Sequence, residues 1–265
     1  MPSRPTQDGA SYITMTEQNL PDAAEVFDRF AALMQVAPEA GGCLVFYGGL
    51  DERGIATAVA ANIAGAASLG VDASADRAKQ ALRQGLCDFM VNNLDEALRI
   101  LKNEVRKKQP VAVALVGDPE RVTAEMLERG VQPDLVTCGA VQEAAFVERG
   151  ARVLPAAAAW ADSLVVTWSV SQDAAMWLPR VDAVAVDALG PMADARVRWV
   201  RLAPRYLQKP LLRERYLRMS AGELLRFVGL LQERSQSGEI SVPVNVLSNG
   251  QSVIQPSAAN SSAAV

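Results

Sequence analysis

The 265-residue sequence contains no histidine. This absence excludes Ser–His and Cys–His catalytic pairs and every metal site built on an imidazole ligand. In an enzyme of this composition, proton transfer would fall to Asp, Glu, Lys, Tyr or Cys side chains, or to a cofactor. We therefore assign no catalytic residue from composition and expect no metal site.

Cysteine is also scarce. The three cysteines, Cys43, Cys87 and Cys138, are odd in number, and no two have the CxxC spacing. This pattern favours reduced thiols over a disulfide framework or a zinc knuckle. No apolar run is suited to a membrane span, and the first residues lack the apolar core of a secretory signal. We expect a cytoplasmic protein without a membrane partner.

Positive charge is not in excess, since 26 Lys and Arg residues face 30 Asp and Glu residues, for a net charge of −4. Such a chain is a poor candidate for binding nucleic acid. Half of the residues are hydrophobic, which is enough to bury a core. Composition predicts a flexible N-terminus over residues 1–20, one domain with a C-terminal extension over 21–247, and a disordered tail over 248–265.

Strand and helix patterns alternate through the first half of the chain. The apolar run Cys43–Tyr47, for example, is typical of a buried parallel strand, and Asp22–Leu33 has helical spacing. This alternation predicts an α/β fold with a doubly wound, mainly parallel sheet of Rossmann-like topology. In the second half we expect strands at residues 165–168, 181–186 and 242–247, with one helix at 219–233 before the last strand.

The turn after the first strand is the first candidate for ligand binding. Gly48 and Gly49 separate that strand from a helix, as in units that hold a phosphate on a helix N-terminus. Asp72 follows 24 positions after Gly48, near the spacing at which a carboxylate reaches a ribose hydroxyl. The same residues also fit a tight turn that only packs helix against strand. Asp51 and Glu52 in the loop carry the wrong charge for a pyrophosphate.

Several segments resemble the urocanase (urocanate hydratase) family. The glycine turn and residues 61–69 are similar to the family's glycine loop and its following helix, and residues 128–137 are close to its "RGVxPDxVT" segment. Residues 93–98 and 114–118 continue the likeness. The resemblance implies a Rossmann-like NAD-binding region over about residues 25–137. Shorter fragments similar to the family follow at 204–211, 220–223 and 237–244.

Urocanases bind NAD⁺ and use its nicotinamide as an electrophile toward urocanate while water adds to the side chain. The resemblance implies NAD as cofactor and a homodimer as the assembly. The residues that it implies for cofactor binding are Gly48, Gly49, Gly54, Asp72, Gly117, Asp118 and Thr137.

Three segments depart from the family pattern. The glycine loop is replaced by residues 51–54, the histidine-bearing segment by 137–143, and the segment with the active-site cysteine by 212–218. Asp118 stands where the family has a neutral Asn, which would disfavour a phosphate but could hold an amine or a ribose hydroxyl. We therefore expect a urocanase-like protein without hydratase activity that keeps a cleft for a dinucleotide or small ligand.

Two alternatives remain open at this point. One is an active hydro-lyase that acts on another substrate with bound NAD and uses Asp72, Asp118 or Cys138. The other is a non-catalytic, homo-oligomeric assembly protein. The Arg-rich segment 205–218 is compatible with an anion site, but it is also typical of a solvated helical face.

Overall fold

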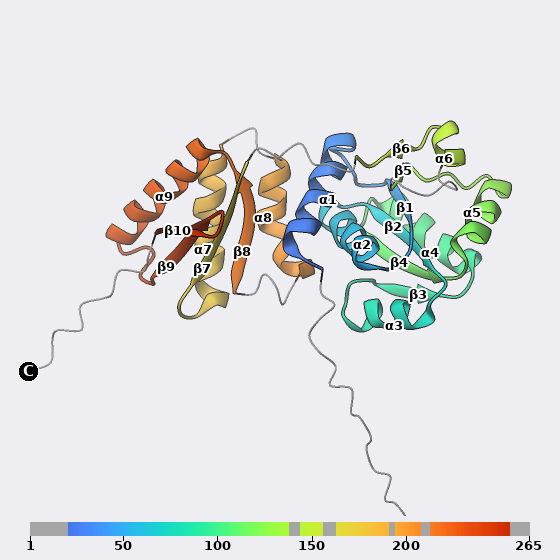
Figure 1. Ribbon diagram of the computed structural model, residues 1–265, viewed down its shortest axis with the longest axis horizontal. Coiled ribbons are helices and arrows are strands. Elements are labelled where there is room, and N and C mark those ends of the chain that lie inside the picture. The colour runs from blue at the N-terminus through green and yellow to red at the C-terminus, as the bar shows by residue number, and fades with distance from the viewer. Residues whose placement is uncertain (1–20, 138–143, 156–162, 191–193, 208–212, 255–265) are drawn as a thin grey trace, which may run out of the picture.

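The structure, a computed structural model, describes residues 21–137, 144–155, 163–190, 194–207 and 213–254. Its elements form two lobes, each built on one sheet (Figure 1). Cys138 lies outside the described residues, as does most of segment 137–143.

The first lobe contains a six-stranded sheet, here called sheet A. Its strands run in the order β3-β4-β2-β1-β5-β6, and every neighbouring pair is parallel. This confirms the predicted doubly wound, Rossmann-like fold. The strands are β1 (Leu44–Gly48), β2 (Ala67–Asp72), β3 (Phe89–Val91), β4 (Val111–Val116), β5 (Leu135–Val136) and β6 (Arg152–Val153).

Helices cover both faces of sheet A, which explains why its central strands β2 and β4 are buried along almost their whole length. One face packs against α1 (Ala23–Val36), α2 (Glu52–Ala64) and α3 (Ala75–Arg83). The other packs against α4 (Leu94–Lys107), α5 (Pro119–Glu128) and α6 (Ala144–Glu148). The Asn93 side chain caps α4 through the Glu96 N–H at 2.9 Å, as the Asn-Leu-Asp-Glu sequence predicts.

The second lobe contains an antiparallel sheet, sheet B, which sequence patterns did not predict. Its strands run in the order β10-β9-β7-β8. They are β7 (Leu164–Val170), β8 (Glu214–Met219), β9 (Val244–Ser248) and β10 (Gln251–Ile254), and its helices are α7 (Ala174–Leu189), α8 (Asp194–Leu207) and α9 (Ala221–Gln236).

Two expectations for this lobe were wrong, and one of the interpretations of segment 205–218 does not hold. Residues 181–186 lie within helix α7 and are not a strand. Segment 205–218 is not one helical face, because it includes the end of α8 and most of β8. Strand β10 lies inside the expected tail, because Asn249 and Gly250 both adopt positive φ and close a hairpin with β9.

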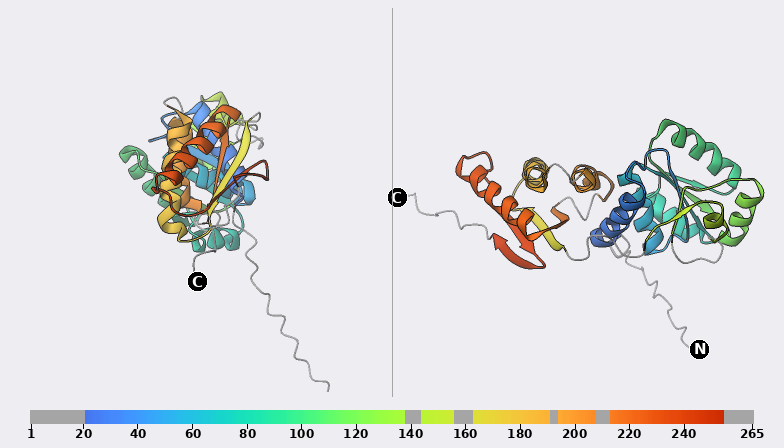
Figure 2. Two further views of the ribbon diagram at one scale, coloured as in Figure 1. Left: turned by 90° about the vertical axis from the view of Figure 1, so that its left-hand side faces the viewer. Right: turned by 90° about the horizontal axis from the view of Figure 1, so that it is seen from above.

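Helix α8 lies between the lobes and packs on α1 and α2 (Figures 1 and 2). The Trp199 ring meets Phe27 of α1 edge-on, with 5.0 Å between ring centroids. Arg218 of β8 pairs with Asp28 of α1 through two hydrogen bonds of 3.1 and 3.2 Å. One hydrophobic cluster runs through both lobes, so the C-terminal extension packs as part of the same core.

Candidate functional site

The candidate site lies at the carboxyl edge of sheet A. From β1 the chain crosses over to β2 on one side. Strand β5 pairs with β1 on the other side, and from β5 the chain continues to β6, which lies farther from β1. The chain therefore leaves these neighbouring strands in opposite directions. In open α/β sheets this switch point is where ligands bind.

The structure brings six of the seven predicted binding residues around the ends of three adjacent strands, β1, β2 and β4. The Gly117 N–H donates to the Asp72 carbonyl at 2.9 Å, and the Gly49 N–H donates to the Val71 carbonyl at 2.7 Å. A Cβ on Gly48 would lie 3.8 Å from the Pro119 Cβ, so the turn after β4 reaches the turn after β1. Five of the six are Gly48, Gly49, Asp72, Gly117 and Asp118, and Gly54 is the sixth.

Gly54 lies in the first turn of α2, directly behind the glycine turn. A Cβ at this position would be 2.1 Å from the Gly49 carbonyl oxygen, so only glycine allows this approach. The Asp51 side chain caps the same helix, because its Oδ1 accepts a 2.9 Å hydrogen bond from the Gly54 N–H.

Thr137 is the seventh predicted residue. It follows β5 directly and is half-buried. Because β5 pairs with β1 on the side away from β2, Thr137 lies across β1 from Asp72.

Asp72 is 1% exposed, and its carboxylate is already fully engaged. It accepts hydrogen bonds from the Leu50 N–H at 2.6 Å and the Ser74 N–H at 2.7 Å. The Arg77 guanidinium adds two more, both 2.8 Å long. Four bonds fill the acceptor capacity of a carboxylate, so Asp72 has no lone pair left for a ribose hydroxyl.

The environment of Asp72 also fixes its charge. Burial acts to raise the pKa of Asp72, but the hydrogen bonds from Arg77, Leu50 and Ser74 outweigh it and hold the pKa below its ordinary value. Asp72 therefore acts as an ionised anchor that ties the turn after β1 to the start of α3.

Asp118 caps α5, the helix that follows β4. Its Oδ1 accepts a long hydrogen bond of 3.4 Å from the Glu120 N–H. The Oδ2 atoms of Asp51 and Asp118 accept no hydrogen bond from any described residue. Each therefore presents one free acceptor and a negative charge beside the glycine turn.

Sequence reasoning missed the partners that occupy this edge. Arg77 and Ser74 had no assigned role, and Asp51 was interpreted only as a misplaced charge. Asp51 accepts a hydrogen bond from the N–H of Gly54, three residues later, and Ser74 accepts one from the N–H of Arg77, also three residues later. This is the spacing of a helix N-cap. That spacing could have revealed both caps. The approach of Arg77 to Asp72 depends on how α3 packs.

The described thiols lie away from this edge and show no sign of activation. Burial raises the pKa of Cys87 to about 12, with a smaller contribution from Asp88. Burial, with Asp134, also raises the pKa of Cys43. A raised pKa lowers the thiolate fraction and hence the reactivity of both side chains.

Two other kinds of feature are absent from the described ranges. No described helix has the length and hydropathy needed to cross a bilayer. Within the same ranges, no cluster of three or more Cys, Asp or Glu residues has the arrangement of a metal site.

The chain matches a protein family over most of the first lobe. The family described as the urocanase Rossmann-like domain matches residues 24–144. The match covers sheet A as far as β5, together with α1 to α5, and it ends before the second lobe. It agrees with the resemblance over residues 25–137, whereas the fragments at 204–211, 220–223 and 237–244 fall outside it. The match and the parallel sheet together identify residues 24–144 as a Rossmann-like domain of the urocanase family.

Proposed function

We propose that this protein, whose residues 24–144 match the urocanase Rossmann-like domain, lacks hydratase activity and binds a small ligand without phosphate at the carboxyl edge of sheet A. The observation that carries this proposal is the capture of backbone N–H groups by carboxylates. Leu50, Gly54, Ser74 and Glu120 all donate their N–H to Asp51, Asp72 or Asp118.

The urocanase Rossmann-like domain family binds NAD, but the residues at this edge do not fit its pyrophosphate. A dinucleotide needs free N–H groups at the turn and the helix N-terminus, and here carboxylates hold those of Leu50, Gly54 and Glu120. Two like charges about 5 Å apart repel by about 3 kcal/mol at an effective dielectric constant of about 20. Asp51 and Asp118 would each impose such a penalty on a phosphate.

The same two carboxylates suit a different ligand. Each has a free Oδ2 acceptor, which fits a hydroxyl or an amine on a neutral or cationic molecule. The loss of hydratase activity rests on the sequence, because the segments that carry the family's histidine and active-site cysteine are replaced at 137–143 and 212–218.

A charge series tests the proposal. Adenosine, AMP and NAD⁺ share the adenosine group and differ in phosphate, so we expect affinity by titration calorimetry to fall from adenosine to the two phosphorylated compounds. Asp51→Ser with Asp118→Asn keeps both N-caps but removes two charges, and should improve NAD⁺ binding. Glu214→Gln with Glu233→Gln makes the same charge change in the second lobe and should leave it unaltered.

Three results would contradict the proposal. Tight NAD⁺ binding by the unaltered protein would show that the caps do not exclude a pyrophosphate. If titration with none of the three compounds produced heat, the proposed ligand cleft would be refuted. Loss of absorbance at the urocanate band during incubation with the protein and NAD⁺ would show retained hydratase activity.

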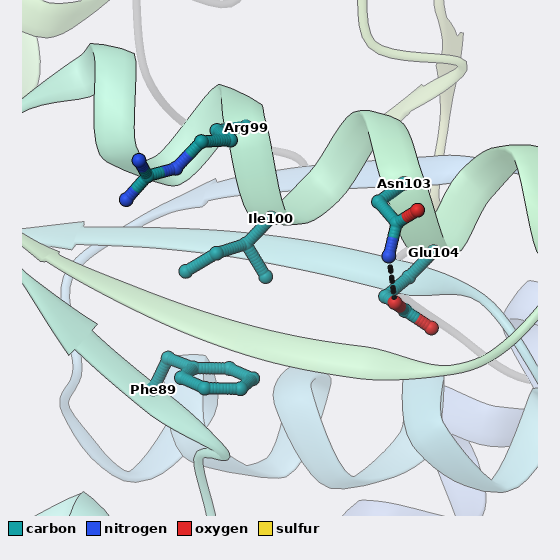
Figure 3. A pocket seen from close by; sticks show the side chains of 5 residues that line it. All are labelled: Phe89, Arg99, Ile100, Asn103 and Glu104. Carbon is teal, nitrogen blue, oxygen red and sulfur yellow. Dashed lines mark hydrogen bonds between the residues drawn. The ribbon is translucent and has the colours of Figure 1, made fainter.

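One surface favours a second role, self-association as a homodimer. Strand β3 is an edge of sheet A, and its Phe89 is 47% exposed. Figure 3 shows Ile100 of α4 pointing toward Phe89, with Arg99 and Glu104 on the same helix. These residues and Asn103 line a cavity of about 510 Å³. An open strand edge with exposed apolar residues is a common site of pairing.

We propose a second copy of this chain as the occupant of this surface. Arg99 and Glu104 carry opposite charges on the two sides of Ile100, so a twofold axis would bring Arg99 of each copy near Glu104 of the other. Analytical ultracentrifugation should show a dimer that Phe89→Glu dissociates. Leu225 of α9 is 73% exposed, and Leu225→Glu should leave the dimer intact. A dimer that survives Phe89→Glu, or a monomeric unaltered protein, would refute this interface.

A further inference from the structure

A cavity of about 430 Å³ opens between α7 and α8 in the second lobe, outside the segment that matches the urocanase family. Its volume lies within the range of small-molecule sites. Its walls are mainly apolar and are formed by Pro179, Ala183, Val186, Val200 and Pro204.

The floor of this cavity is charged. Asp182 of α7 and Arg215 of β8 both line it, and each is only 8% exposed. The Arg215 Nε lies 2.9 Å from Asp182 Oδ2 and 3.2 Å from Oδ1. The buried Trp168 indole, cross-strand neighbour of Arg215, donates to Asp182 Oδ1 at 2.9 Å.

This ion pair is costly for a purely structural contact. Burial raises the pKa of Asp182 even though Arg215 and Trp168 oppose the shift. Replacing a buried pair by well-packed apolar residues is often neutral or stabilising. A buried charged pair that faces a cavity with apolar walls is, in contrast, the usual composition of a ligand site.

Both helices that frame the cavity contain a proline that lines it, Pro179 in α7 and Pro204 in α8. Proline has no N–H, so the carbonyl four residues earlier lacks its helical donor. For Pro204 that carbonyl belongs to Val200, which also lines the cavity. Each proline thus removes one hydrogen bond from the helix that contains it, beside the cavity.

The hydrogen bonds of Asp182 indicate what the ligand carries. Its Oδ1 accepts two bonds, from Trp168 and Arg215, whereas the described partners of Oδ2 supply only one. One acceptor site therefore remains on a side chain that lines the cavity. The charges around the cavity balance, because Arg201 and Asp187 accompany Arg215 and Asp182. The buried charges of the cavity, Arg215 and Asp182, are paired with each other, so a charged ligand that lost its hydration would find no unpaired buried counter-charge.

We propose that the cavity between α7 and α8 binds a small neutral molecule with an apolar body and one hydroxyl or amide N–H, which donates to Asp182. This site is independent of the carboxyl edge of sheet A, so its test does not depend on the function proposed for that edge.

Nuclear magnetic resonance of the full chain tests the site, with benzyl alcohol as probe and the Trp168 indole N–H as reporter. We expect a saturable shift of this resonance with a Kd in the millimolar range, as suits so small a ligand. Toluene lacks the hydroxyl and should bind about fivefold to tenfold more weakly, and benzoate should also bind more weakly.

Two substitutions on the exposed side of α7 provide the matched comparison. Ala183→Phe would fill the cavity while leaving both residues of the ion pair unchanged, and should abolish the saturable shift. Met176 is 49% exposed and is not part of the cavity lining, so Met176→Phe should bind like the unaltered protein. An absent shift, a shift that survives Ala183→Phe, or equal affinity for toluene and benzyl alcohol would overturn the proposal.

Discussion

Replacing Gly54 by alanine tests the geometry of the glycine turn most directly. In an ordinary helix this change stabilises by up to about 1 kcal/mol, because alanine loses less backbone entropy. At Gly54 the new Cβ would lie 2.1 Å from the Gly49 oxygen and 3.0 Å from its carbonyl carbon. Residues 54–64 of α2 are all buried, so the helix has little freedom to withdraw. Overpacking of this kind costs about 1–3 kcal/mol, and we expect a net loss near 2 kcal/mol.

Urea unfolding followed by circular dichroism measures this loss through the linear dependence of the unfolding free energy on denaturant. Gly229 of α9 is the matched control, because a Cβ there would meet no atom within 4 Å. Gly229→Ala should therefore stabilise by up to about 1 kcal/mol, which separates the two variants by about 3 kcal/mol. If Gly54→Ala were as stable as Gly229→Ala, the close approach of α2 to the glycine turn would be refuted.

A remaining prediction concerns acid stability. The folded protein holds the pKa of Asp72 below its ordinary value of 3.8, so the ionised carboxyl stabilises the fold above that pH. This stabilisation is lost as the pH falls through the lower folded-state pKa. The destabilisation caused by Arg77→Met should therefore be larger in urea unfolding at pH 7 than at pH 3. Lys79→Met removes an exposed i,i+3 pair with Asp76 and should show little pH dependence. An Arg77→Met effect that does not change with pH would contradict the pairing.

The first lobe was predictable because its signals are local and repeated. Continuous apolar runs such as residues 111–116 became buried central strands, and Asn93 caps the start of α4, as its Asn-Leu-Asp-Glu sequence indicates. Parallel order followed from the alternation of helices and strands. The strand order itself, with β4 inserted between β2 and β3, depends on long-range pairing that no local pattern encodes.

The second lobe was less predictable because its patterns conflict. Val181, Val184 and Val186 favour a strand, and Pro179 argues against a helix, yet all four lie in α7. Burial of Val181 and Val184 against sheet B overrides these local preferences. The Asn249-Gly250 pair, in contrast, is a strong hairpin signal that the composition of the tail concealed.

The candidate site divides in the same way. Its positions could be predicted, because strand ends in a parallel sheet share one edge. Its chemistry could not, because the availability of a carboxylate depends on which donors reach it. Asp72 has the expected place for a ribose ligand, but Arg77 and two backbone N–H groups consume its acceptors.

Helix α2 connects this edge to the second lobe. Its N-terminus is capped by Asp51 beside the glycine turn, whereas its C-terminus is capped from outside, by the Arg198 Nε that donates to the Ile63 carbonyl at 2.8 Å. A cation at this end also complements the helix dipole. Gly65 makes room for it, because a Cβ there would lie 2.5 Å from an Arg198 nitrogen. Arg198 belongs to α8, so the lobe beyond the matched domain helps to hold the helix that shapes the candidate site. The second lobe therefore contributes to holding α2 in place, and removing it would expose both the end of α2 and the shared core around Trp199.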